Sequence, residues 1–218
     1  MVTPAELVRA ATERGLDLIA VTDHDTVRST REARERGEAV GLTVVEGEEV
    51  TTAWPAQTHI LAWYLTKQVK SGMSLEDTVD AIHDQGGLVV VPHPFMPTYF
   101  GSIQPRMLQR LIEKHSLDGI EMMSTVPVGK RRRRLLAEFY EANKHRLGAA
   151  IGASDCHFGS HDLGRKLTRY EDDFRAAVAH RTTEPIDGTT APIPAVLSAR
   201  QQWRALVDLP IRRMRGMV

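Results

Sequence analysis

Four short segments decide the fold: IAVTDH (19–24), THILAW (58–63), VVVPHP (89–94) and IGASDCH (151–157). Each joins a short apolar run to a His or Asp of the kind that binds metals. A parallel β/α barrel uses this pattern to bring several side chains to one rim, because the carboxyl ends of its strands meet there. The four segments therefore predict a metal-dependent hydrolase.

The stretches between these segments predict helices. Thr3 and Glu6 frame a capping box with Pro4 at the first helical position, so a helix should begin there and end at Gly15. Amphipathic or charged runs predict further helices near residues 29–36, 74–86, 104–114 and 130–144, and apolar runs predict strands at 42–45, 49–51 and 119–122. Strands that alternate with helices favour a parallel α/β architecture, with every candidate ligand at or just past the carboxyl end of its strand.

Composition narrows the class of protein. A chain of 218 residues with 42% hydrophobic and 26% charged residues can bury one sizeable core. The net charge is zero and aromatic residues make up only 6%, so the sequence carries no clear nucleic-acid signal. One cysteine excludes an intrachain disulfide framework, and there is no signal-peptide pattern or long apolar run. We therefore expect a cytoplasmic protein. No oligomeric state is indicated.

The C-terminal segment differs in composition. Residues 1–188 form the expected main domain, and residues 189–218 read as a Thr-, Pro- and Ala-rich linker followed by a basic tail. From Ala199 onward the tail carries five arginines and the single acid Asp208. A basic amphipathic helix that contacts a membrane surface or a partner is one interpretation, and a packed or frayed terminal helix is the other.

The metal candidates are mixed nitrogen and oxygen ligands. Four of the nine histidines lie in the strand-end segments, accompanied by two acids, and the full set is His24, Glu49, His59, His93, Asp155 and His157. Any one of these histidines alone would more simply be a core residue, but their equivalent positions favour a shared site. Imidazole and carboxylate without thiolate suit Zn, Mn or Fe in hydrolytic centres.

Other polar residues remain open between a functional and a structural role. His161 follows the Asp155-x-His157 loop, where a contact to a ligand or to phosphate competes with ordinary loop polarity. Arg131 and Arg132 belong to a run of arginines that either includes a phosphate clamp or forms a solvated helix face. The remaining histidines, His83, His115, His145 and His180, lie on predicted helices among charged residues, where solvent exposure is expected.

Five ordered motifs resemble those of the PHP superfamily, named for polymerase and histidinol phosphatase. They are TDHDT (22–26), GEE (47–49), HIL (59–61), PHP (92–94) and SDCH (154–157), and the similarity runs from about Thr3 to about Thr183. The resemblance implies a distorted (β/α)7 barrel with up to three divalent metals, commonly Mn, Fe or Zn, and hydrolysis of phosphate esters. It also implies that the six residues of the candidate set are metal ligands, with Asp155 and His157 closest to the catalytic role.

The chain departs from the family pattern at its start. Family members begin with a strand bearing His-x-His, and this first strand is missing upstream of Thr3. We expect that the natural reading frame extends upstream and encodes it, and that fewer than three metals bind without it. A second departure is the short spacing between His59 and His93, which leaves no room for the helical insertion of the branch that degrades oligoribonucleotides.

The expected reaction is in-line attack on phosphorus by a water that the bound metals activate, within a small phosphorylated substrate. No nucleophile elbow is present, and Cys156 is interpreted as a filler in a position where the family has a small residue. Two alternatives stay open. One is a degenerate, non-catalytic PHP-like module that binds a metal or ligand, and the other is a nucleic-acid-processing PHP domain.

Overall fold

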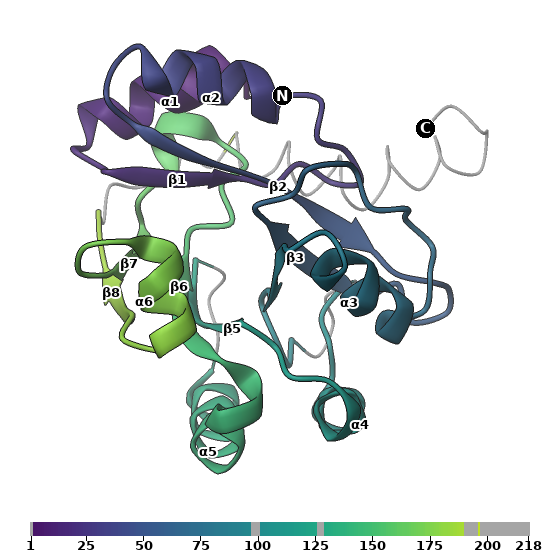
Figure 1. The fold of residues 1–218 in the computed structure, drawn as a ribbon. Helices are drawn as coiled ribbons and strands as arrows, with labels where there is room; N and C mark the ends of the chain where they lie inside the picture. The colour runs from purple at the N-terminus through teal and green to yellow at the C-terminus, as the bar shows by residue number, and fades with distance from the viewer. Residues whose placement is uncertain (1, 97–100, 126–128, 190–195, 197–218) are drawn as a thin grey trace.

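The computed structural model describes residues 2–96, 101–125, 129–189 and 196. Six strands form one curled sheet in the order β1-β2-β3-β4-β5-β6, which makes a half-barrel (Figure 1). The strands are β1 (Leu18–Val21), β2 (Thr43–Thr51), β3 (His59–Trp63), β4 (Leu88–Val91), β5 (Gly119–Ser124) and β6 (Ala149–Ala153). The mixed α/β class predicted from the sequence is confirmed. The predicted linker and basic tail, 189–218, lie outside the described residues except for Thr189 and Val196.

The strand directions differ from a purely parallel sheet. Pairs β1–β2, β4–β5 and β5–β6 are parallel, but β3 runs antiparallel to both β2 and β4. The short loop between Thr51 and His59 explains this, because a parallel connection needs a crossover of a dozen residues or more. The expectation of an all-parallel sheet was therefore wrong for β3.

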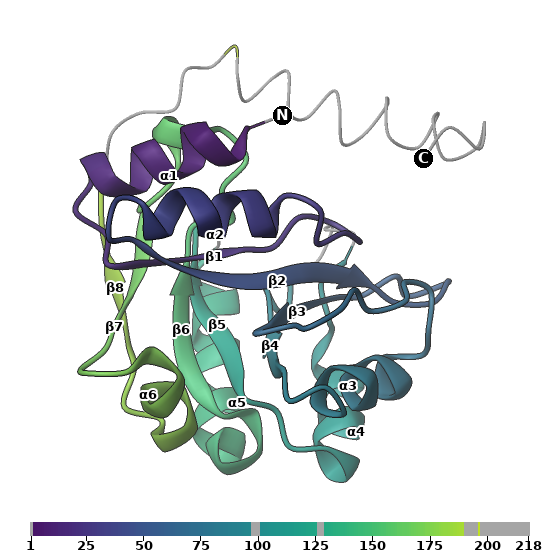
Figure 2. The same ribbon diagram turned by 45° about the horizontal axis from the view of Figure 1, so that its top comes forward.

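Five helices lie on the outside of the half-barrel. Helices α1 (Pro4–Glu13) and α2 (Thr30–Glu38) lie side by side over β1 and β2 (Figure 2). Three further helices each lead into a strand. They are α3 (Leu75–His83) before β4, α4 (Pro105–Lys114) before β5 and α5 (Lys130–Leu147) before β6. The predicted capping box is present: the Thr3 hydroxyl accepts a hydrogen bond from the Glu6 amide at 3.2 Å, and the Glu6 carboxylate accepts one from the Thr3 amide at 2.8 Å. None of the helices in the described part of the chain is both long and apolar enough to span a bilayer.

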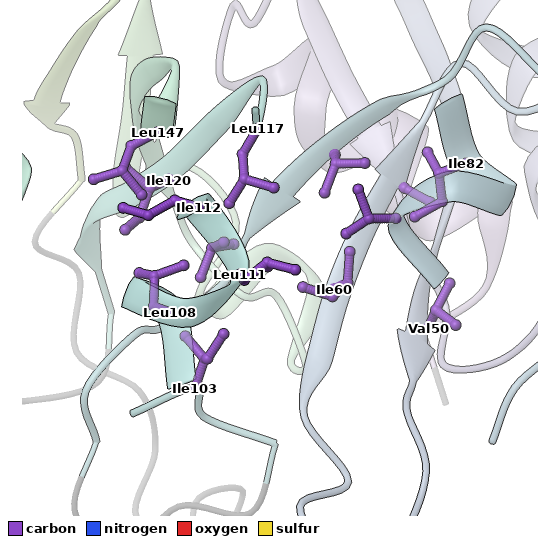
Figure 3. Close-up of a cluster of buried hydrophobic side chains, with 14 of the residues drawn as sticks. Val50, Ile60, Ile82, Ile103, Leu108, Leu111, Ile112, Leu117, Ile120 and Leu147 are labelled. Atoms are coloured by element: carbon purple, nitrogen blue, oxygen red, sulfur yellow. The ribbon is translucent and has the colours of Figure 1, made fainter. Parts of the chain in front are cut away.

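Strand alternation separates two hydrophobic layers. Val89 and Val91 point outward into the large core beneath α3, α4 and α5, whereas Val90 points inward. Figure 3 shows the outer core, in which Val50, Ile60, Ile82, Leu108, Ile120 and Leu147 are labelled. The inward layer is shared with helix α6 (Phe174–His180), whose Phe174 and Val178 pack among the inward strand residues.

A separate two-stranded sheet lies beside β6. It consists of β7 (Lys166–Arg169) and β8 (Glu184–Asp187), which pair antiparallel. The Gly152 amide donates to the Thr168 hydroxyl at 3.0 Å, and a side chain at Gly152 would lie 2.2 Å from the Leu167 carbonyl oxygen. The glycine therefore lets the two-stranded sheet approach β6 closely. With this small sheet and the antiparallel β3, the architecture is a half-barrel with an attached two-stranded sheet.

Candidate metal centre

His24 and Glu49 are placed beside each other by the pairing of β1 with β2. Beyond the last residue of β1, the parallel pairing continues as an isolated bridge between His24 and Glu49. The Glu49 amide donates to the Asp23 carbonyl at 3.1 Å, and the Asp25 amide donates to the Glu49 carbonyl at 3.0 Å. Two backbone hydrogen bonds thus fix the two candidate ligands side by side.

His59 reaches the same rim from the opposite strand direction. It is the first residue of β3, where it pairs with Thr51. The expectation that every ligand lies at the carboxyl end of its strand was therefore wrong for His59, because the amino end of an antiparallel strand lies at the carboxyl ends of its neighbours. The His59 amide donates to the Gly101 carbonyl at 2.7 Å. Gly101 has a φ of +88°, and a Cβ there would lie 2.3 Å from the His59 ring.

His93 follows β4 and is held by a buried acid. Its φ is +28°, a left-handed conformation that is unusual for a residue with a side chain. Its amide donates to Glu121 Oε2 at 2.7 Å, and Ser102 Oγ donates to its carbonyl at 2.8 Å. Burial raises the pKa of Glu121 to about 8, despite the opposing effects of the His93 charge and amide. Glu121 therefore orients the backbone of a candidate ligand.

Three imidazoles converge on the Glu49 carboxylate. Glu49 Oε1 lies 2.7 Å from His59 Nδ1 and 3.1 Å from His93 Nε2, and Oε2 lies 3.7 Å from His24 Nε2. The Glu49 side chain is only 7% exposed, and that of His93 only 2%. Burial raises the pKa of Glu49, but the close contacts and charges of the surrounding histidines outweigh burial and hold the pKa well below its usual value.

This donor set fits a divalent cation. One ligand atom from each of His24, Glu49 and His59 lies within 4.8 Å of the others, the separation expected for atoms around one ion. His59 Nδ1 is buried and lacks hydrogen-bond geometry to any described group, although Glu49 Oε1 is 2.7 Å away. Two buried lone-pair donors that face each other without a hydrogen bond are the arrangement that a shared cation satisfies.

Asp155 and His157 lie in the loop after β6, close to this cluster. The ring centroids of His24 and His157 are 6.5 Å apart. Asp155 adopts a φ of +49°, and its carbonyl lies 2.8 Å from His157 Nδ1. Burial lowers the pKa values of His93 and His157, but nearby carboxylates outweigh it and raise both. For His93 these are chiefly Glu49, with a smaller contribution from Asp155, and for His157 chiefly Asp155, with a smaller contribution from Glu49. The loop and the cluster are therefore within electrostatic reach of each other.

A buried carboxylate, Asp162, organises this loop. Its Oδ2 accepts the His157 amide at 2.6 Å, both of its oxygens lie 3.0 Å from the Phe158 amide, and its Oδ1 accepts the Cys156 thiol at 3.0 Å. Burial, followed by the Asp162 charge, raises the pKa of Cys156. A thiol that stays protonated is a poor nucleophile, which supports the interpretation of Cys156 as a filler.

The three polar residues that the sequence left open between a functional and a structural role lie in different places. The Arg132 guanidinium donates to the Pro94 carbonyl beside His93, from its Nε at 2.8 Å. Arg131 is exposed at the amino-terminal end of α5, and His161 is exposed in the 3-10 turn η1 (Gly159–His161). Arg132 thus braces the loop of a candidate ligand, while the other two side chains face solvent.

Sequence reasoning missed Glu121 and Asp162. Both are acids that accept hydrogen bonds from backbone amides, and each is no more than 3% exposed. Glu121 had a detectable signal, because it follows Gly119-Ile120 inside a predicted buried strand. Asp162 had none beyond its position in a polar loop.

No family model matches the chain. An uncharacterised protein of Methanocaldococcus jannaschii is 31% identical over 121 residues, which cover 56% of this chain and 66% of that protein. A two-domain protein of Bacteroides vulgatus that contains a predicted PHP-like metal-dependent phosphoesterase superposes with a TM-score of 0.67 at 22% identity, over 86% of this chain and 61% of the other. A lesion-specific endonuclease of Pyrococcus furiosus superposes with a TM-score of 0.59 at 14% identity, over 84% of this chain and 52% of the other.

These similarities confirm the resemblance to the PHP superfamily at the level of the fold. The chain has the fold of PHP-like metal-dependent phosphoesterases. It spans about two thirds or less of the length of each of the three proteins compared above. These structural relatives are described as a predicted phosphoesterase, an amidohydrolase and an endonuclease, so the shared fold by itself selects neither an activity nor a substrate.

Proposed function

We propose that this chain is a metal-dependent hydrolase of phosphate esters. One observation carries the proposal: three imidazoles, those of His24, His59 and His93, converge on the buried carboxylate of Glu49. A protein that needed only a stable core would gain little from gathering these polar groups at one point, because Glu49, His59 and His93 are largely buried there and lose their hydration. A bound cation would compensate these groups for the hydration that they lose.

The metal would be Mn, Fe or Zn, held by nitrogen and oxygen atoms. His24, Glu49, His59 and His93 would hold the first ion, and Asp155 and His157 would complete a second position beside it. In such sites a divalent cation lowers the pKa of a water and neutralises charge on the phosphate oxygens. The absence of thiolate ligands favours hydrolytic chemistry over a structural zinc site.

The chain's own residues would hold and orient this chemistry. Because the Asp155 carbonyl engages His157 Nδ1 at 2.8 Å, the ring orientation is set and Nε2 remains for a ligand or a proton. Glu121 fixes the His93 backbone, and Asp162 fixes that of His157. These buried acids would keep the ligands in place during turnover. Asp155, as an anion next to the cluster, would orient the attacking water.

Two measurements on the purified chain test the proposal. Elemental analysis after incubation with Mn, Fe or Zn should find bound metal, and the loaded protein should hydrolyse 4-nitrophenyl phosphate or bis(4-nitrophenyl) phosphate. A chain that binds no metal would contradict the proposal outright. Bound metal without hydrolysis of either ester would favour the degenerate, non-catalytic module instead. Preference for the diester would favour the nucleic-acid-processing alternative, which the endonuclease fold relative also supports.

A further inference from the structure

A cleft lies on the outer face of the sheet, between the loop that joins β2 to β3 and helices α3 and α4. It encloses about 440 Å³, within the range of small-molecule sites. Thr58 belongs to its lining, whereas the next residue, His59, faces Glu49 inside the half-barrel. Because successive side chains of an extended strand point to opposite faces, the sheet separates the cleft from the metal cluster. A molecule bound in the cleft is therefore a second ligand and not the ester that the metal centre would hydrolyse.

Two buried hydroxyl groups in the lining lack strong hydrogen-bond partners. Thr52 and Thr58 extend the β2–β3 ladder beyond its last pair, since the Thr52 amide donates to the Thr58 carbonyl at 2.9 Å. Thr52 is 4% exposed, and its hydroxyl has no hydrogen-bond partner in the described part of the chain. Thr58 is 2% exposed, and among the described residues its hydroxyl bonds only the weak acceptor Met107 Sδ, at 3.5 Å. Buried hydroxyls normally have good partners, so this pair indicates a polar group that the cleft receives.

Helix α4 presents positive charge to the cleft at the end where helices normally place acids. Arg106 lies in its first turn, which contains no acid, and Gln104 at the cap position forms no side-chain cap. Gln104 Nε2 instead donates to the Met96 carbonyl at 3.1 Å. Because the amino end of a helix carries partial positive charge, an arginine there is unfavourable unless an anion lies nearby. The start of α4 is thus suited to a bound anion.

The two arginines of the lining are available to such an anion. Arg106 and Arg110 are one turn apart and exposed, and neither guanidinium forms a salt bridge with any residue that the structure describes. The acid in the lining is Glu76, which lies 4.0 Å from Lys114, a residue outside the lining. Two guanidinium groups and one carboxylate leave a single net positive charge, which matches a monoanion better than a phosphate dianion. Guanidinium groups bind a carboxylate through paired hydrogen bonds.

The remaining walls of the cleft are largely apolar. They comprise Ala53 and Ala56 from the loop, Leu75 from α3, and Met107 and Leu111 from α4. A small inorganic ion would leave these side chains in contact with water, whereas a ligand with an apolar body would cover them. The lining as a whole therefore favours a molecule that is charged at one end and apolar over the rest.

We propose that this cleft binds a small carboxylate with an apolar body. Its carboxylate would lie on Arg106 and Arg110 at the start of α4, its body would cover the apolar walls, and the hydroxyls of Thr52 and Thr58 would serve its polar atoms. The inference goes beyond the proposed function, because binding in the cleft requires neither the metal nor hydrolysis.

Fluorine NMR of 4-fluorophenylacetate, with the neutral 4-fluorophenylacetamide as the matched ligand, tests the proposal. The parent chain should bind the carboxylate at least about five-fold more tightly than the amide, and Arg106→Gln with Arg110→Gln should remove that preference. Thr52→Val keeps the shape and has no hydrogen bond to lose within the fold, so it should stay folded and weaken carboxylate binding about two-fold or more. Ala56→Phe, at an exposed position of the lining, should weaken binding of both ligands by filling the cleft.

The matched control is Arg9→Gln with Arg36→Gln, which removes the same charge from α1 and α2. It should leave the affinity for the carboxylate within about two-fold of that of the parent chain. Equal weakening by this control pair would show general attraction between charges and overturn the inference. Equal affinity of the parent chain for the carboxylate and the amide, or binding of neither, would overturn it as well.

The dependence on metal separates the cleft from the metal centre. The affinity for 4-fluorophenylacetate should be the same with Mn and with EDTA, because the sheet lies between the two sites. Binding that requires Mn, or competition with bis(4-nitrophenyl) phosphate, would place the carboxylate on the metal and overturn the inference. A parent chain that prefers the carboxylate to the amide but binds no metal would retain the cleft and contradict the proposed function alone.

Discussion

The cluster around Glu49 and the loop that carries Asp155 and His157 lie at the same rim but are held in different ways. Sheet pairing places the cluster, since His24 is bridged to Glu49 and His59 begins a paired strand. The loop has no such ladder and depends on Asp162, which binds two consecutive amides and a thiol. The cluster should therefore tolerate change in its surroundings, whereas the loop should fail when one residue is altered.

The largest expected effect is loss of metal from the cluster. His93→Ala removes a buried nitrogen 3.1 Å from Glu49, so metal affinity should fall by at least about 1000-fold, because loss of a direct ligand exceeds the roughly 10- to 100-fold that loss of an outer partner costs. His83→Ala is the matched control, because His83 lies on α3 and pairs with Asp118 instead. Elemental analysis of the two variants decides the matter, and equal metal content would remove His93 from the ligand set.

Next in size is loss of activity from the loop. Asp155→Asn keeps the shape of the side chain and tolerates the positive φ of +49°, but it removes the negative charge. We expect metal-dependent hydrolysis to fall by about 100-fold or more while the circular dichroism spectrum and thermal midpoint stay close to those of the parent chain. Turnover at the parental rate would mean that Asp155 has only a structural role.

A third change tests the dependence of the loop on one carboxylate. Asp162→Asn places an amide donor where the His157 and Phe158 amides need acceptors, which should lower the free energy of unfolding by about 1–3 kcal/mol. Chemical denaturation measures that loss. Metal bound at the cluster should persist, and if Asp162→Asn emptied the cluster as thoroughly as His93→Ala, the two regions would not be separately held.

The smallest expected effect concerns a pair outside both regions. His83 Nε2 lies 2.9 Å from Asp118 Oδ2, and this hydrogen bond raises the pKa of His83 although partial burial opposes it. Because the folded-state pKa lies above the unfolded one, the pair stabilises the fold below the unfolded pKa, and this is lost as pH rises through the folded value.

His83→Ala should therefore lower the free energy of unfolding by no more than about 1 kcal/mol at pH 5.5, and by less at pH 8.5. Denaturant titrations at the two pH values measure this difference. A larger loss at the higher pH would show that the imidazolium pair is not the stabilising contact.

Much of the fold could be predicted because its signals are local. The capping box at Thr3 and the apolar strands at Leu88 and Ala149 depend on neighbouring residues only, and all three are confirmed. The single strand β2 was predicted as two, since Glu46 and Gly47 resemble a turn. Glu46 instead pairs with Arg34, and Gly47 allows the Ala62 carbonyl to approach to 2.3 Å from where a Cβ would lie.

The remaining features depend on distant residues. Strands β7 and β8 carry no apolar run, because they are only partly buried and gain their place by pairing with each other beside β6. The residue types of the cluster could be predicted, but the reversed direction of β3 was missed, although the short loop between Thr51 and His59 was a signal for it. The roles of Glu121 and Asp162 were not predicted for a related reason. Their hydrogen-bond partners are backbone amides, which every residue except proline offers, so no pattern of residue types marks them.

Gly101 has a consequence for how this protein can change over time. The residues just before α4 lie beside the cluster, because the Gly101 carbonyl accepts the His59 amide, so they are a natural place for sequence variation that alters substrate preference. Position 101 is the exception, because any side chain there would enter the volume of the His59 ring. In a library of loop variants selected for a new substrate, glycine should survive at this position while its neighbours diversify.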